Sequence, residues 1–119
     1  RKMKISEIQV FDKSTNVNSF DLLGKSMWLD KSTRVGLFNS ISIEKNAGKS
    51  DTVLWYDAIK YIIPIFDALA MLNALELYAL NCYNVTQSHI SAVKALQTIE
   101  EIENYDYTVG YPVKLSFPG

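Results

Sequence analysis

The stretch from Asp67 to Tyr83 constrains the fold most strongly, because its apolar residues recur with the spacing of an α-helix. At about 100° per residue, one wide face of this helix is apolar and a few polar residues lie opposite. The apolar face consists of Ala68, Met71, Leu72, Leu75, Tyr78, Ala79 and Cys82, and the polar residues are Asn73, Glu76, Asn81 and Asn84. Such a face must be covered, so we expect this helix to be buried at the centre of the fold.

The same helix carries a second group of apolar residues on its polar side. These are Phe66, Leu69, Leu77 and Leu80. A helix that is apolar on more than one side is covered there by other parts of its own chain or by another protein. We therefore predict that this second stripe contacts the chain's termini or a partner, and we treat it as a candidate interaction surface.

Two β-hairpins are expected outside this helix. The first runs over residues 17–22 and 25–29, with Gly24 supplying the turn, and the second over residues 51–56 and 60–65 around Asp57-Ala58. Both arms of the second hairpin are rich in β-branched and aromatic residues. Apolar and polar residues alternate poorly there, which indicates that both of its faces are covered.

The aromatic residues of these hairpins are a second candidate interaction surface. They are Trp28, Trp55, Tyr56 and Tyr61, and the first three are the candidates for this surface. Aromatic side chains on strands mostly pack across the sheet or into the core. Trp and Tyr are also enriched at the centres of protein interfaces, so both roles stay open.

A further helix is predicted over residues 31–46. Asp30 is a suitable N-cap and Gly48 a suitable residue to end it. Residues 39–44 alternate as a strand would, but the capping signals at both ends favour the helix.

The remaining elements are short. We expect helices over residues 5–11, from Thr86 onward, and from a capping box formed by Thr98 and Glu101, followed by an extended tail over residues 109–117. Together these elements predict an α+β fold. Its two antiparallel β-hairpins form a small sheet, packed with a central buried helix and additional short helices. Residues 1–119 are expected to form a single small domain, either a whole protein or part of a longer polypeptide.

Composition excludes several classes of function. The net charge is −1 and the basic residues are scattered, which argues against nucleic acid as a partner. A single cysteine, Cys82, excludes a disulfide framework. No signal peptide and no apolar run of about 20 residues is visible, so we predict neither secretion through a signal peptide nor a membrane span.

No set of residues predicts catalysis. Gly48-Lys49-Ser50 resembles the end of a phosphate-binding loop, but Ile43 stands where that motif needs glycine, so a helix end is favoured. Glu76, or Cys82 with His89, are the only candidates for a small enzyme. We predict no enzymatic activity, no catalytic residues, no cofactor or metal ligands and no small-molecule substrate.

The sequence as a whole resembles a phage and prophage domain family without an assigned function, found in gut anaerobes. The resemblance rests on several segments. They are Val17-Asn18-Ser19-Phe20, Trp28-Leu29-Asp30-Lys31, Thr33-Arg34-Val35-Gly36-Leu37, Leu54-Trp55, Ala74-Leu75-Glu76-Leu77-Tyr78-Ala79, Cys82-Tyr83-Asn84-Val85-Thr86 and Tyr105-Asp106-Tyr107-Thr108. Related domains end some tail-fibre assembly proteins.

The resemblance implies a phage or prophage-encoded structural or protein-interaction domain associated with a virion component. The expected partner is a phage structural protein or a second copy, in the host cytoplasm during assembly or in the virion. The alternative is a tail-fibre assembly chaperone.

Overall fold

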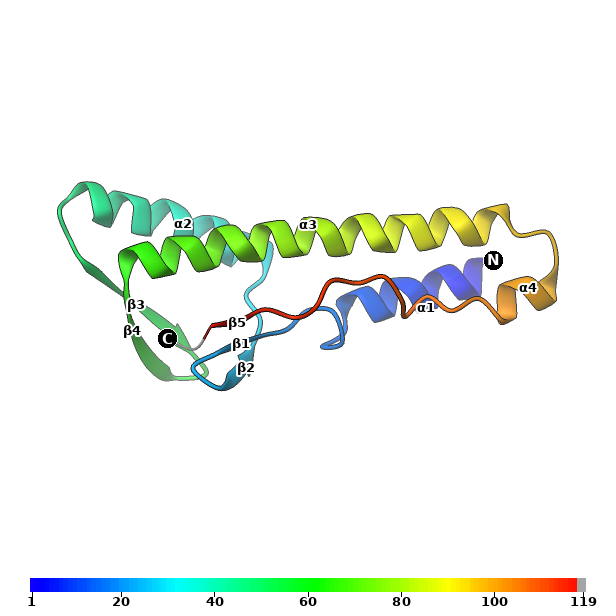
Figure 1. Cartoon of the computed structure of the whole chain (residues 1–119), viewed down its shortest axis with the longest axis horizontal. Coiled ribbons are helices and arrows are strands. Elements are labelled where there is room, and N and C mark those ends of the chain that lie inside the picture. Colours follow the sequence, from blue (N-terminus) through cyan, green and yellow to red (C-terminus); the bar gives the residue numbers. More distant parts are fainter. Residues whose placement is uncertain (118–119) are drawn as a thin grey trace. The chain divides into compact units, whose positions relative to one another are not determined.

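The computed structural model describes residues 1–117 of the chain (Figure 1). Its elements, in chain order, are α1 (Lys2–Lys13), β1 (Phe20–Leu22), β2 (Lys25–Met27), α2 (Lys31–Asn46), β3 (Asp51–Tyr56), β4 (Ile59–Pro64), α3 (Ile65–Ala95), α4 (Ile99–Glu103) and β5 (Ser116–Phe117). The predicted α+β class, with two hairpins and a long central helix, is confirmed.

The chain divides into two compact units that are described separately. Unit 1 comprises residues 1–19 and 78–114, and unit 2 comprises residues 20–77 with the C-terminal segment from Leu115. Helix α3 contributes its first part to unit 2 and its second part to unit 1. The single-domain organisation stays a prediction.

Helix α3 differs from the prediction. It runs unbroken for 31 residues, whereas the sequence suggested one helix ending at Tyr83 and another beginning at Thr86. No glycine or proline lies between Ile65 and Ala95, so nothing in this segment forces the helix to stop. Thr86 is buried inside the helix instead of capping it, because its hydroxyl has partners in unit 1.

By length and composition α3 meets the criteria for a helix that crosses a membrane. Its most apolar window of 18 residues has a mean hydropathy of 1.3, and 39% of that window is buried within the protein. The core helix of a water-soluble protein passes the same test. One apolar face of α3 is buried within the protein, as at Leu72 and Leu75, whereas Phe66, Leu77 and Leu80 of the same helix are exposed.

The ends of α2 are as predicted. The Asp30 carboxylate accepts a hydrogen bond of 2.8 Å from the Thr33 N–H, which caps the N-terminus. At the other end the N–H groups of Gly48 and Lys49 donate to the carbonyls of Lys45 and Glu44. Gly48 has a φ of 88°, so the Gly48-Lys49-Ser50 segment is a Schellman-type helix end and not a phosphate loop.

The two hairpins belong to two sheets, where the prediction joined them in one. One sheet has the order β2-β1-β5, in which the tail strand β5 runs parallel to β1, and the other contains β3 and β4. In β3–β4 the burial alternates along each strand, with Thr52, Leu54, Tyr61 and Ile63 buried. The expectation that both faces of this hairpin are covered is therefore wrong.

Each unit has its own buried interior. The core of unit 2 collects side chains from both sheets, α2 and α3, namely Phe20, Leu22, Met27, Leu29, Ile41, Leu54, Tyr61, Ile63, Ile65, Ala68, Met71, Leu72 and Leu75. Unit 1 buries Ile8, Val17, Tyr78, Cys82, Thr86, His89 and Val93. Apolar groups dominate the first interior, and polar groups make up a large part of the second.

Candidate functional site

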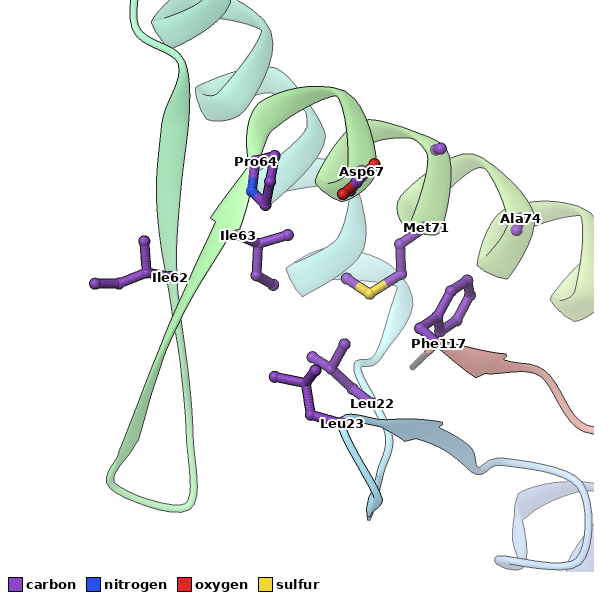
Figure 2. Close-up of a pocket in the computed structure, with 10 residues that line it drawn as sticks. Leu22, Leu23, Ile62, Ile63, Pro64, Asp67, Met71, Ala74 and Phe117 are labelled. Atoms are coloured by element: carbon purple, nitrogen blue, oxygen red, sulfur yellow. The ribbon is translucent and has the colours of Figure 1, made fainter. Parts of the chain in front are cut away.

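Unit 2 contains an apolar cavity of about 510 Å³ (Figure 2). Leu22 from β1, Ile63 from β4, Met71 from α3 and Phe117 from β5 line it. Asp67, in the first turn of α3, is the only charged residue among its lining residues. A cavity of this size with a single polar group suits an apolar side chain or ligand, because pockets that bind ligands measure about 300–1,000 Å³ and are mostly apolar.

The β3–β4 hairpin, which lines this cavity through Ile62, Ile63 and Pro64, also has an uncovered face. Val53 and Ile62 are paired across the two strands, and Trp55 follows Val53 on the same face, next to Lys60. The exposed fractions are 42% for Val53, 62% for Trp55 and 65% for Ile62. We call these three residues the hairpin face. Adjacent exposed apolar side chains of this kind mark interaction surfaces more often than scattered ones do.

Not all of the predicted aromatic residues belong to this surface. Trp55 does, whereas Tyr56 and Trp28 are half-buried and pack against the core of unit 2. The Trp28 ring lies edge-on to Phe20 and under the Arg34 guanidinium, 5.1 Å from ring centre to Cζ. Trp28 therefore has a packing role.

The predicted second stripe of α3 is only partly open. Leu69 packs against the core of unit 2, so it leaves the candidate surface. Phe66, Leu77 and Leu80 are exposed, and Phe66 lies under the Lys45 ammonium group, 5.0 Å from the ring centre. The described residues of the chain's two ends therefore do not cover these side chains, and the contact with a partner stays a prediction.

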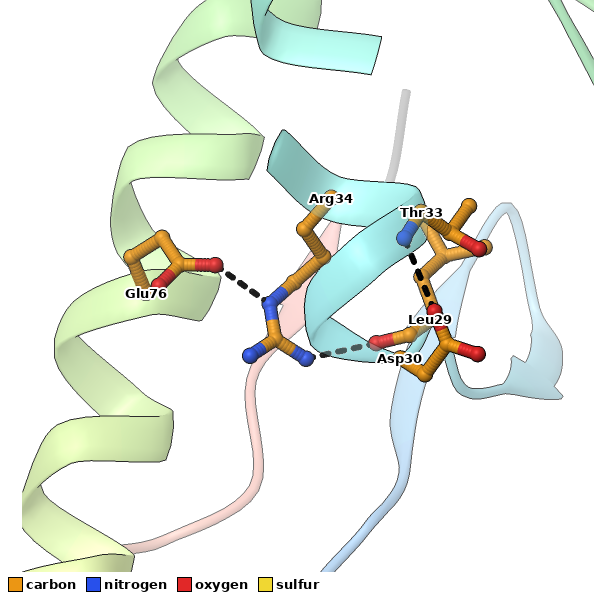
Figure 3. A network of polar contacts seen from close by, with 5 residues as sticks. All are labelled: Leu29, Asp30, Thr33, Arg34 and Glu76. Carbon is orange, nitrogen blue, oxygen red and sulfur yellow. Dashed lines mark hydrogen bonds and ion pairs between the residues drawn. The ribbon is translucent and has the colours of Figure 1, made fainter. Parts of the chain in front are cut away.

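A buried cation organises the other side of unit 2 (Figure 3). The Arg34 Nε donates to Glu76 Oε1 at 2.6 Å, and its Nη1 donates to the Leu29 carbonyl at 2.6 Å. Arg34 is buried while the Glu76 carboxylate is partly exposed. This ion pair joins α2 to α3 and to the end of β2, and it gives Glu76 a structural partner in place of a free carboxylate.

The other catalytic candidates lie in unit 1. Burial raises the pKa of the Cys82 thiol, which keeps it protonated at neutral pH and makes it a poor nucleophile. His89 lies in the last third of α3, not in the first turn of a helix as predicted. Its Nε2 donates a hydrogen bond of 2.8 Å to the Val109 carbonyl, and its Nδ1 lies 2.6 Å from the Tyr105 hydroxyl.

These contacts are part of a hydrogen-bond network in the interior of unit 1. The Thr86 hydroxyl lies 2.8 Å from the Asp12 carboxylate and 2.6 Å from the Tyr111 hydroxyl. The Tyr78 hydroxyl donates to the Val17 carbonyl at 2.6 Å. These hydrogen bonds pair the buried polar groups of unit 1 with one another.

Sequence reasoning missed the cavity and its residues Leu23 and Asp67. Leu23 occupies the left-handed region with a φ of 52°, and as a bulky residue it is unusual there. It is half-exposed at the rim of the cavity. An apolar residue beside Gly24 in a two-residue turn, where Asn or Asp is preferred, was the available signal.

Metal binding and relatives add no further constraint. Within residues 1–117, no three side chains of His, Cys, Asp or Glu lie close enough to share a metal ion. Comparison with family models, curated proteins and solved structures finds no match to this chain. The resemblance to phage domains therefore remains a prediction.

Proposed function

We propose that the chain is a protein-interaction domain of a phage or prophage-encoded structural component, and that it binds its partner through unit 2. The docking surface consists of the apolar cavity and the hairpin face formed by Val53, Trp55 and Ile62. The observation that carries the proposal is the group of exposed apolar side chains on the hairpin face, together with the apolar cavity that Ile62 of the same hairpin helps to line.

The proposal is supported by the cost of leaving such a surface in water. Apolar area contributes about 25 cal/mol per Å² when it is removed from water, so Trp55 and Ile62 gain free energy from any partner that covers them. Near neutral net charge also suits a surface that binds through shape and apolar contact and not through electrostatic steering. The phage setting rests on the resemblance given above.

A site-specific cross-link tests the docking surface. A photoreactive phenylalanine analogue replaces Trp55 in one variant and Lys49, an exposed residue of the same unit, in a control variant. Each variant is expressed together with the neighbouring genes of its own genome, and cross-linked products are identified by mass spectrometry. We expect one neighbouring gene product to be joined to position 55 and not to position 49. Equal yields at both positions, or none at position 55, would contradict the proposal.

A further inference from the structure

Strand β4 has a free edge whose hydrogen-bonding groups can be assigned residue by residue. Among the described residues, β4 pairs with β3 alone. Asp57 and Ala58, between the two strands, have φ values of 53° and 61°, which defines a two-residue type I′ turn. In such a turn the flanking residues, Tyr56 and Ile59, exchange both of their main-chain hydrogen bonds.

From that pair the ladder alternates between bonded and non-bonded pairs along the hairpin. The register places Tyr61 and Ile63 in bonded pairs with β3, and the bond of 2.9 Å from the Ile65 N–H to the Ser50 carbonyl continues the same series. Lys60 and Ile62 occupy the pairs between them. Their N–H and C=O groups therefore point away from β3, and no described residue bonds to them on that side.

The next residue in this series is Pro64. Because proline has no N–H, it is tolerated in a strand only where no ladder bond is lost, which is the free edge. The cavity lies along this same edge, since Ile62, Ile63 and Pro64 all line it. Figure 2 shows the Ile63 side chain turned toward Leu22 and Met71 and the Ile62 side chain turned to the opposite side. The cavity is therefore bordered by the main-chain edge of β4 at Ile62.

We propose that the free edge of β4 binds an extended segment of a partner protein as an added strand, and that the cavity receives an apolar side chain of that segment. This inference rests on the proposed function and specifies how its docking surface is used. A cavity alone would fit many ligands, whereas unpaired N–H and C=O groups beside it are completed by an extended main chain. The third strand also relieves the weakness of a two-stranded sheet.

The position of the edge defines the chemistry of the segment. A residue placed opposite Ile62 lies on the hairpin face beside Ile62 and Val53, which favours a β-branched or aromatic residue there. Its two neighbours point to the other side, toward Ile63 and Met71, and are apolar. Asp67 forms no ion pair with another described residue, so a lysine or arginine next to the apolar residues complements the rim of the cavity.

The test selects ligands from a displayed library of random twelve-residue peptides and compares two proline variants. Ile62→Pro removes the outward N–H of β4, and Asp51→Pro removes the outward N–H of β3 at a position that pairs with Pro64 and lies outside the hairpin face. Both substitutions leave the bonds between β3 and β4 in place, so their melting temperatures should be similar. We expect enriched peptides with three consecutive apolar residues next to a lysine or arginine. Ile62→Pro should weaken their binding at least about tenfold and Asp51→Pro less than about twofold.

Amide hydrogen exchange of the unsubstituted chain keeps the test independent of folding in the variants. Binding of a selected peptide should slow exchange at Lys60 and Ile62 at least about tenfold, because their free N–H groups become bonded. Peptides that bind both variants equally and leave these amides unprotected overturn the added strand but leave the docking surface intact. Failure to enrich any peptide overturns the inference as well. If the chain formed dimers that disappeared only with Ile62→Pro, the added strand would come from a second copy of the chain. That result would overturn the proposal that a different protein supplies it. In the cross-linking experiment described above, by contrast, the absence of cross-links at position 55 would contradict the proposed function itself.

Discussion

The two units of this chain differ in which polar and apolar side chains they bury and which they expose. Unit 1 buries polar side chains and pairs them, as in the contacts of Thr86 with Asp12 and Tyr111 and of His89 with Tyr105 and Val109. Unit 2 buries almost only apolar groups, with Arg34 as its main buried charge, and leaves apolar side chains in water on its hairpin face. We call unit 1 closed because its buried polar groups are paired with one another, and unit 2 open because of its hairpin face. Unit 1 also exposes single apolar side chains, such as Met3, Val10 and Ile99.

The difference separates structure from binding. A paired polar network fixes one arrangement of helices and tail, because any loosened member would leave a buried group unsatisfied. An exposed apolar face beside a cavity contributes nothing to the stability of the free chain and gains free energy only with a partner. Cys82 and His89, which the sequence offered as catalytic candidates, lie in unit 1.

The largest effect on stability should come from the buried charge of unit 2. Arg34→Ala removes the donor to the Leu29 carbonyl and to Glu76 and leaves a space beside Trp28. We expect a loss of about 3 kcal/mol in the free energy of unfolding, since Glu76 is partly exposed and can be hydrated. Urea denaturation measures it. Lys31→Ala, in the exposed first turn of the same helix, is the control and should change stability by less than about 0.5 kcal/mol. A loss below about 1 kcal/mol for Arg34→Ala would show that the ion pair does not organise this unit.

A smaller effect is expected in the network of unit 1. Thr86→Val keeps the shape of the side chain but removes its hydroxyl, so Asp12 and Tyr111 each lose a partner. The expected cost is about 1–2 kcal/mol, and Thr86→Ser should recover most of it. If both variants were as stable as the unsubstituted chain, the hydrogen-bond network would not stabilise unit 1. The proposed difference between the two units would then be contradicted.

Acid should destabilise both units through their capping carboxylates. The N–H of Thr33 lowers the pKa of Asp30 in unit 2, and the hydroxyl of Thr108 lowers the pKa of Asp106 in unit 1, both from an ordinary value of 3.8. A carboxyl group with a lowered pKa stabilises the fold above its ordinary value, and this contribution is lost as the pH falls through the pKa of the folded state. The urea midpoint should therefore fall between about pH 5 and pH 2, and less so in Asp30→Asn, whose amide still caps the helix without titrating. If the urea midpoint of Asp30→Asn fell as steeply with pH as that of the unsubstituted chain, Asp30 would be excluded as a source of the acid sensitivity.

The parts of the fold that follow local rules could be predicted from the sequence. Asp30, Gly48 and Thr98 act within three or four residues of themselves, and each of these helix ends was predicted correctly. Distant contacts could not be predicted. The parallel pairing of β5 with β1 joins residues far apart in sequence, and the continuation of α3 past Tyr83 depends on the contacts that bury Thr86.

The candidate site shows the same division. Trp55 was selected from its residue type and is exposed, but the same reasoning also selected Trp28 and Leu69, which pack against the core. Their exposure depends on Phe20, Arg34 and the strands around them, which composition does not place. The cavity combines residues of four strands and helices, so it exists only in the folded chain.

The central claim is that the open unit, and not the closed one, binds the partner. The most direct test is the dissociation constant of the polypeptide that cross-links to position 55, measured for two single variants. Trp55→Ser removes an exposed apolar side chain of unit 2, and Val10→Ser removes one of similar exposure, 69% against 62%, from unit 1. We predict that Trp55→Ser weakens binding at least about tenfold and Val10→Ser less than about twofold, with both variants as stable as the unsubstituted chain. Equal losses, or a larger loss for Val10→Ser, would contradict the account.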